Sequence, residues 1–149
     1  MPERTVRSLE SRALGLLARR EYSRSELSRR LAPHAEGPDE INALLDRLES
    51  RRLLSDQRFT ESLIHRRAER FGVARVRQEL AQHGISAEAA AASLEVLRQT
   101  EFDRARHVWA RRYGQLPTDA AERVRQMRFL AARGFSHDII RRVLRSEDD

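Results

Sequence analysis

Arginine is the residue type in this 149-residue chain that could carry binding chemistry, and its distribution is uneven. All 29 basic residues are arginine, and the formal net charge is +6. Five arginines and one acid lie between positions 66 and 77, and eleven arginines and three acids lie between positions 104 and 145. Guanidinium groups bridge phosphate oxygens or pair with carboxylates. The pattern predicts a polyanionic partner such as nucleic acid, because arginines that neutralise phosphates release condensed counterions.

The predicted contact surface consists of arginines near helix ends in the middle and last parts of the chain, where few acids oppose them. These arginines are Arg66, Arg67, Arg70, Arg75, Arg77, Arg111, Arg112, Arg125, Arg128 and Arg133. For any single one of them, a solvated helix face is the alternative interpretation.

The sequence contains no constellation typical of catalysis or metal binding. The five histidines, at positions 34, 65, 83, 107 and 137, lack the i, i+4 spacing of a helical metal pair, and there is no cysteine. No glycine-rich phosphate loop follows a strand, and no serine, histidine and acid form a recognisable group. We therefore expect no enzyme activity, catalytic residue, metal or cofactor.

The elements that must position the arginines are helices. Between Asp56 and Ile85, apolar residues recur at steps of three and four, stop at Gly72, and resume until Gly84. This periodicity predicts two amphipathic helices joined by a tight turn. Gly84 suits the left-handed conformation that ends many helices.

This helical unit recurs along the chain. Leu31, Leu80 and Leu130 occupy equivalent positions 49 and 50 residues apart, and an aromatic residue follows each first helix. Such a period is typical of repeat architectures. The sequence predicts an all-α fold of three tandem three-helix repeats, at residues 1–54, 55–99 and 100–149, the last with an acidic tail. Chance matching of short helical patterns is the competing interpretation.

Several residue types predict where helices begin. Ser23 with Glu26 is expected to form a reciprocal capping box, in which each side chain accepts a hydrogen bond from the other residue's backbone N–H. The third helix of the central repeat is expected from Ser86 to Leu97. Other expected caps are Asp39, Ser55 or Asp56, and the Gly134-Phe135-Ser136 segment.

Features of targeted or membrane-spanning proteins are missing. The first twelve residues are charged and lack the apolar core of a signal peptide. No stretch approaches the roughly 18 uninterrupted apolar residues of a membrane span. The absence of cysteine suits a reducing compartment. We expect a cytoplasmic protein that does not bind membranes.

Motifs along nearly the whole chain resemble the RecX family of recombinase regulators. They are Arg20-Glu-Tyr-Ser23 with Glu26-Leu27 and Leu31, Leu54-Ser-Asp56 with Arg58-Phe59, Phe71-Gly72, Arg75-Val-Arg77, Glu79-Leu80, Gly84-Ile85, and Phe129-Leu130-Ala-Ala-Arg133-Gly-Phe135-Ser136. One departure is Arg51-Arg52, where the family often has a glycine suited to a left-handed cap.

The resemblance implies an elongated, curved and largely monomeric array of repeats that binds the RecA recombinase, chiefly as its filament on DNA. RecX-like proteins generally limit the extension or stability of that filament. They thereby restrain ATP hydrolysis, strand exchange and co-protease activity. The arginine-rich face would then contact single- and double-stranded DNA within the filament.

Two other functions remain open at this point. The chain could be a general or sequence-specific DNA-binding protein that places one helix in the major groove. It could also be a helical-repeat scaffold that binds an acidic protein partner. Few asparagine or glutamine side chains are available for adenine readout, which disfavours sequence-specific binding.

Overall fold

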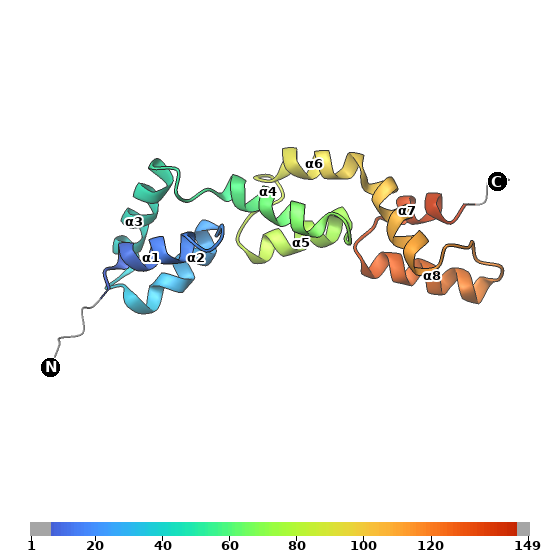
Figure 1. Cartoon of the computed structure of the whole chain (residues 1–149), viewed down its shortest axis with the longest axis horizontal. Coiled ribbons are helices and arrows are strands. Elements are labelled where there is room, and N and C mark those ends of the chain that lie inside the picture. Colours follow the sequence, from blue (N-terminus) through green and yellow to red (C-terminus); the bar gives the residue numbers. More distant parts are fainter. Residues whose placement is uncertain (1–6, 146–149) are drawn as a thin grey trace. The chain divides into compact units, whose positions relative to one another are not determined.

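The chain folds into helices joined by short loops, and a computed structural model describes residues 7–145. Within that range there is no strand, which confirms the predicted all-α class (Figure 1). None of the helices between residues 7 and 145 could cross a membrane. The predicted acidic tail, Glu147–Asp149, lies outside the described residues.

The helices divide between two compact units. Unit 1 holds the residues up to Phe59 together with His83–Ile85, and unit 2 holds Thr60–Gln82 and the residues from Ser86 onward. Unit 1 contains α1 (Leu9–Leu17), α2 (Arg24–Leu31), the short 3-10 helix η1 (Ala32–His34) and α3 (Pro38–Ser50). Helix α4 (Asp56–Arg67) begins in unit 1 and continues in unit 2, which also contains α5 (Val73–Gln82), α6 (Ala91–Gln99), α7 (Glu101–Arg112), α8 (Ala120–Ala132) and α9 (His137–Val143).

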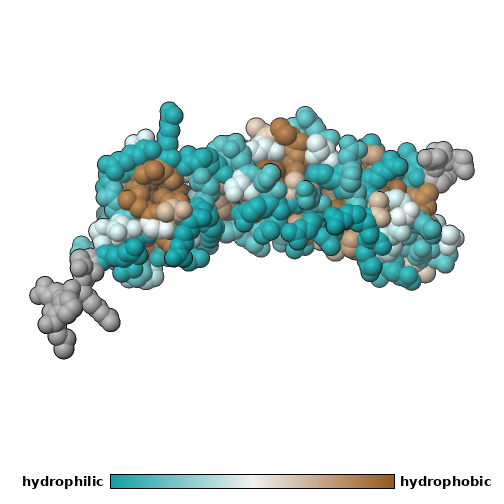
Figure 2. Space-filling view, viewed as in Figure 1, coloured by the Kyte–Doolittle hydropathy of each residue, from teal (hydrophilic) through white to brown (hydrophobic). Residues whose placement is uncertain are grey.

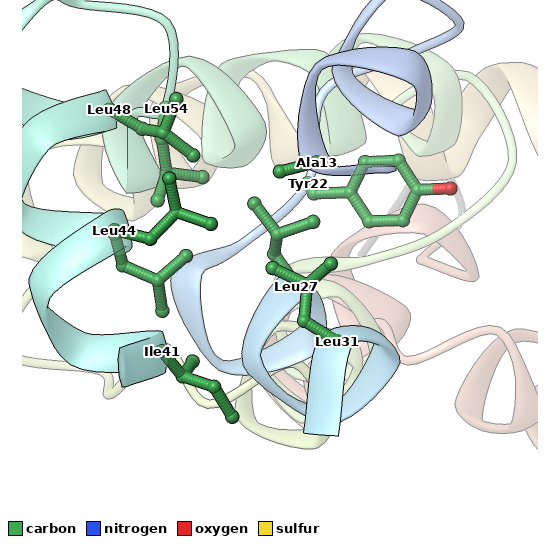
Figure 3. Close-up of a cluster of buried hydrophobic side chains, with 9 residues drawn as sticks. Ala13, Tyr22, Leu27, Leu31, Ile41, Leu44, Leu48 and Leu54 are labelled. Carbon is green, nitrogen blue, oxygen red and sulfur yellow. The ribbon is translucent and has the colours of Figure 1, made fainter. Parts of the chain in front are cut away.

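The core of unit 1 consists mainly of leucines from α2 and α3, which pack against α1. Leu27 and Leu45 are completely buried, and Ala13 of α1 lies against the same cluster (Figure 3). Burying each such leucine contributes roughly 1.5–3 kcal/mol. Figure 3 shows the hydroxyl of Tyr22 pointing away from these leucines, so the ring packs while its polar end avoids the apolar interior.

Unit 2 has a second core, in which α7 packs on α8 and α9. Leu130 and Ala105 are fully buried there. The sequence places Leu31, Leu80 and Leu130 in equivalent positions. The exposed fraction of each of these leucines is at most 1%. Outside these cores the visible face of the molecule is mostly hydrophilic (Figure 2).

Most helix starts follow the predicted caps. The side-chain oxygens of Ser23, Ser55 and Ser136 accept backbone hydrogen bonds from residues three positions further on. Glu26 does not complete a reciprocal box. Its carboxylate instead bonds Arg20 at 2.7 Å and lies 3.3 Å from Nδ1 of His83.

Two predicted helix starts are wrong. Asp39 does not cap α3, because Gly37 is the N-cap and Pro38 takes the first helical position, which suits its fixed φ. Helix α6 begins at Ala91 rather than Ser86. The hydroxyl of Ser86 accepts a hydrogen bond from the N–H of Ala89, in a turn that leads directly into α6. The repeat boundaries at residues 54 and 99 stay predictions.

Arg52 occupies the left-handed position at the end of α3, where glycine would be expected. Its φ is 61°. The N–H of Arg52 donates to Glu49 and that of Leu53 donates to Leu48, which is the Schellman arrangement.

We expect Arg52→Gly to raise the free energy of unfolding by roughly 0.5–1 kcal/mol, because glycine adopts positive φ without a steric cost. Urea denaturation followed by circular dichroism measures the change. The matched variant is Arg51→Gly. Arg51 has a φ of −87°, so glycine there should lower stability. Equal effects of the two substitutions would contradict this account.

Candidate functional site

Two turns of unit 2 that are distant in sequence lie directly against each other. The N–H of Gly72, between α4 and α5, donates to the carbonyl oxygen of Arg133 at 2.8 Å. The N–H of Ala74 donates to Gly134, between α8 and α9, at 3.3 Å. Gly134 has a φ of 89°, a conformation that favours glycine. These backbone bonds bring the side chains of both turns onto one surface.

Arg104 of α7 donates hydrogen bonds to carbonyl oxygens at the C-terminal ends of α4 and α6, next to this surface. One terminal nitrogen donates to the carbonyl oxygens of Ala68 at 2.9 Å and Phe71 at 2.6 Å, just after α4. The other donates to Leu97 of α6 at 2.9 Å, and Nε donates to the hydroxyl of Thr100 at 3.0 Å. A guanidinium suits this role because its donors fan out in one plane.

The surroundings of Arg104 are unfavourable to its charge. Burial lowers the pKa of its guanidinium from the ordinary value, while the nearby carboxylate of Glu101 acts in the opposite direction. Carbonyl oxygens at helix C-termini carry partial negative charge, which compensates part of the desolvation.

Three arginines and three aromatic rings alternate across the joined turns. We call this set the arginine–aromatic ladder, and in order it comprises Arg75, Phe71, Arg133, Phe129, Arg112 and Tyr113. The rings are half-buried, whereas Arg75 and Arg112 are exposed.

The spacing within the ladder is that of cation–π contacts. The Cζ atom of Arg75 lies 4.6 Å from the centre of the Phe71 ring, and that of Arg133 lies 5.6 Å from the same centre. Arg133 is also 5.2 Å from the Phe129 ring, and Arg112 is 6.0 Å from it. Each such contact contributes about 0.5–1 kcal/mol at an exposed site. One terminal nitrogen of Arg75 also donates to the carbonyl oxygen of Ala132 at 3.2 Å. The rings and this carbonyl therefore orient the guanidiniums of the ladder.

The far end of the ladder is fixed by an aromatic pair. The rings of Tyr113 and Phe129 meet edge to face, with centres 5.5 Å apart and planes at 88°. This geometry is favourable for the ring quadrupoles. It couples the end of α7 to α8, and so holds Arg112 next to Arg133.

Two clefts flank the ladder, and Arg70 lines both. The first has a volume of about 600 Å³, and its lining includes Arg70, Arg104, His107, Arg111, Arg112, Phe129 and Arg133, with Glu69 as its one acid. The second has a volume of about 570 Å³ and is lined by Arg67, Arg70, Phe71, Arg75, Gln78, Glu79 and Gln82. The ladder and its clefts form a continuous basic surface within unit 2.

Six of the ten predicted arginines are brought together here, and four are not. Those that line the clefts are Arg67, Arg70, Arg75, Arg111, Arg112 and Arg133. Arg66, Arg77, Arg125 and Arg128 are exposed and line neither cleft. Arg66 donates to the carbonyl oxygen of Ser62 on its own helix, at 3.4 Å.

Arg67 differs from the other cleft arginines because a carboxylate already engages it. Its Nε and terminal nitrogen make three hydrogen bonds of 3.0–3.2 Å with Glu79 of α5. These bonds raise the pKa of the Arg67 guanidinium. The pair links α4 to α5. Because Glu79 already occupies its hydrogen-bond donors, Arg67 should bind an external anion more weakly than Arg75 or Arg70.

Three family models match the chain in succession. They describe the first, second and third three-helix domains of RecX, and they match residues 11–48, 55–94 and 99–144. The chain belongs to the RecX family. Among its RecX relatives, a protein of Leptothrix cholodnii named "Regulatory protein RecX" is 57% identical, over 95% of this chain and 90% of its own length. A protein of the same name from Ralstonia nicotianae is 51% identical, over 95% and 89%.

Solved RecX structures share the fold. The crystal structure of RecX from Lactobacillus salivarius matches with a TM-score of 0.75 at 20% identity, covering 91% of this chain and 92% of that one. A second crystal structure, of a regulatory protein RecX, matches with a TM-score of 0.76 at 19% identity, covering 95% and 72%. The arrangement of helices in the RecX family thus persists at low sequence identity.

Sequence reasoning on this RecX-family chain missed Arg104, His107 and the aromatic partners of the arginines. The available signal was the aromatic residue that closes the first helix of each repeat, which includes Phe71 and Tyr113. The same feature recurs in unit 1, where the guanidinium of Arg20 lies 3.9 Å from the centre of the Tyr22 ring. Among residues 7–145, no group of three or more acids or histidines is arranged to hold a metal ion.

Proposed function

We propose that this chain regulates a RecA recombinase by binding the RecA filament on DNA and limiting its extension or stability. ATP hydrolysis, strand exchange and co-protease activity of the filament would fall in consequence. The proposal is supported by family membership and by relatives that are named regulatory proteins. In this proposal the chain acts as a monomer.

The observation that carries the proposal is the arginine–aromatic ladder between its two clefts. It presents several guanidiniums that are held by rings and carbonyls rather than neutralised by acids. Such groups bind phosphate oxygens bidentately and form charge-assisted hydrogen bonds with carboxylates. We propose that the ladder contacts the DNA backbone within the filament, with Arg66, Arg77, Arg125 and Arg128 as outlying contacts.

The test is the steady-state ATP hydrolysis of RecA on single-stranded DNA, with the chain added below stoichiometry before or after filament assembly. The Arg75→Ala/Arg133→Ala variant should need about thirtyfold more protein for half-maximal inhibition, because each of the two lost charged hydrogen bonds weakens binding by roughly 1 kcal/mol. A stronger effect during assembly would favour capping of the filament end over binding along it.

The charge-matched control is Arg98→Ala/Arg141→Ala. Both residues are exposed arginines of unit 2 that pair with acids three positions earlier. Control inhibition should equal that of the wild type. If the ladder variant inhibits as well as the control while its circular dichroism is unchanged, the ladder is not the contact surface. If the wild-type chain leaves ATP hydrolysis unchanged in both orders of addition, the recombinase proposal fails.

A further inference from the structure

The first fifty residues have no net charge in sum, yet the structure separates their charges. They contain nine arginines and nine acids. Five of the acids pair with only four arginines: Glu26 with Arg20, Asp46 and Glu49 with Arg24, Glu10 with Arg51, and Glu21 with Arg58. Three other described acids of this stretch, Glu36, Asp39 and Glu40, lie at or just before the start of α3.

Four arginines that take no part in these pairs line one cleft. It has a volume of about 340 Å³ and lies between α1 and α2, with Gly15, Leu16 and Leu31 among its lining residues. We call it the basic cleft of unit 1, and its charged or titratable residues are Arg7, Arg12, Arg19, Arg30 and His34. No acid is among the residues that line it.

The chemistry of the lining selects an anion. Four guanidiniums around one cleft repel each other, and a bound anion would relieve this repulsion. Arg12 and Arg19 are separated along α1 and the turn after it by on the order of 10 Å, at 1.5 Å per helical residue. A row of charges of this length suits a chain of phosphates better than a single compact group.

The backbone around the cleft points to the same ligand class. Sites for compact phosphate groups commonly use backbone N–H groups at a helix N-terminus. Residues 8–11, which form the N-terminus of α1, do not line the cleft. The backbone N–H of Ser11 already donates to the hydroxyl oxygen of Ser8 at 3.0 Å. Arginine side chains from α1, α2 and the segments on either side of α1 remain as the donors, as in proteins that track a nucleic-acid backbone.

We infer that the basic cleft of unit 1 is a second binding site for the phosphate backbone of nucleic acid, separate from the ladder of unit 2. The inference does not depend on the recombinase proposal. Each of the two sites would retain measurable binding when the other is removed.

Gly15 allows the cleft to be tested without weakening the fold. A Cβ atom added there would meet only a terminal nitrogen of Arg7 at 3.9 Å, an ordinary contact distance. Gly15→Ala and Gly15→Glu both improve helix propensity within α1. Only Gly15→Glu places a carboxylate among the arginines, where it would pair with them and repel phosphate.

The experiment measures binding of the full chain to fluorescein-labelled oligothymidine by fluorescence anisotropy over a series of sodium chloride concentrations. Relative to Gly15→Ala, we expect Gly15→Glu to bind about tenfold more weakly. The slope of log K against log salt should fall by about 1.4, as for two lost phosphate contacts on a single strand. The melting temperature of Gly15→Glu should be no lower than that of Gly15→Ala. Arg51→Ala, which removes one positive charge outside the cleft, should change the slope little.

A second arm uses the Arg75→Ala/Arg133→Ala background. Salt-dependent binding should persist there and disappear when Gly15→Glu is added. The inference is overturned if Gly15→Glu and Gly15→Ala bind oligothymidine equally in both backgrounds. It is also overturned if sodium triphosphate displaces the oligonucleotide far better than sodium chloride of equal ionic strength, because the cleft would then hold a compact polyphosphate.

Discussion

Replacing Gly72 with alanine is expected to lower the free energy of unfolding by roughly 3 kcal/mol, combining overpacking with lost hydrogen bonds. A Cβ atom on Gly72 would overlap the carbonyl group of Gly134 and lie 2.6 Å from the backbone nitrogen of Phe135. These are backbone atoms, so no side-chain rotation can relieve the overlap. The turns must separate, which also breaks the bonds from Gly72 to Arg133 and from Ala74 to Gly134.

Urea denaturation followed by circular dichroism measures this loss, and the fluorescence of Trp109 reports on α7 and α8. Trp109 is the one tryptophan of the chain, and its indole N–H donates to Gln126 of α8 at 2.8 Å. Gly37→Ala is the matched control, since no atom lies within 4 Å of an added Cβ atom there. It should cost under about 1 kcal/mol as a change at a helix N-cap. Equal stabilities of Gly72→Ala and Gly37→Ala would show that the two turns do not meet.

Features of the fold that depend on neighbouring residues could be predicted from the sequence. Ser23, Ser55 and Ser136 were predictable as caps because each serine oxygen accepts a hydrogen bond from a backbone N–H only three residues further on. The start of α6 was not, because an alanine tract has strong helix propensity and carries no local stop signal before Ala91. The buried leucines near a 50-residue spacing were visible because each belongs to a local amphipathic pattern.

The ladder was invisible to sequence reasoning for a different reason. Phe71 and Arg133 are far apart in the chain, and they meet only because Gly72 and Gly134 allow their turns to touch. Charge counting identified the arginines but could not separate Arg75, which is exposed on the ladder, from Arg67, which Glu79 engages. Both carry the same charge in the sequence, and only tertiary contacts distinguish them.

Loss of Arg104 is expected to lower the free energy of unfolding about as much as Gly72→Ala does. The cause here is lost hydrogen bonds rather than overpacking. We expect Arg104→Met to lower the free energy of unfolding by roughly 3 kcal/mol, because carbonyl oxygens of Ala68, Phe71 and Leu97 lose a charged donor. Methionine fills much of the volume of the arginine stem, so the loss would reflect hydrogen bonding more than a cavity. The exposed Arg106 on the same helix is the control, and Arg106→Met should change stability by under about 0.5 kcal/mol.

Arg104→Lys separates the charge of Arg104 from its geometry. Lysine keeps a positive charge, but one ammonium cannot reach the ends of α4 and α6 at the same time, as the planar fork does. We expect Arg104→Lys to recover about 1 kcal/mol of the loss in Arg104→Met, as measured by urea denaturation. It should also weaken inhibition in the ATP hydrolysis assay, because Phe71 would no longer be held beneath Arg75. If Arg104→Lys matched the wild type in both measurements, charge alone would hold the two helix ends, and the fork geometry would be irrelevant.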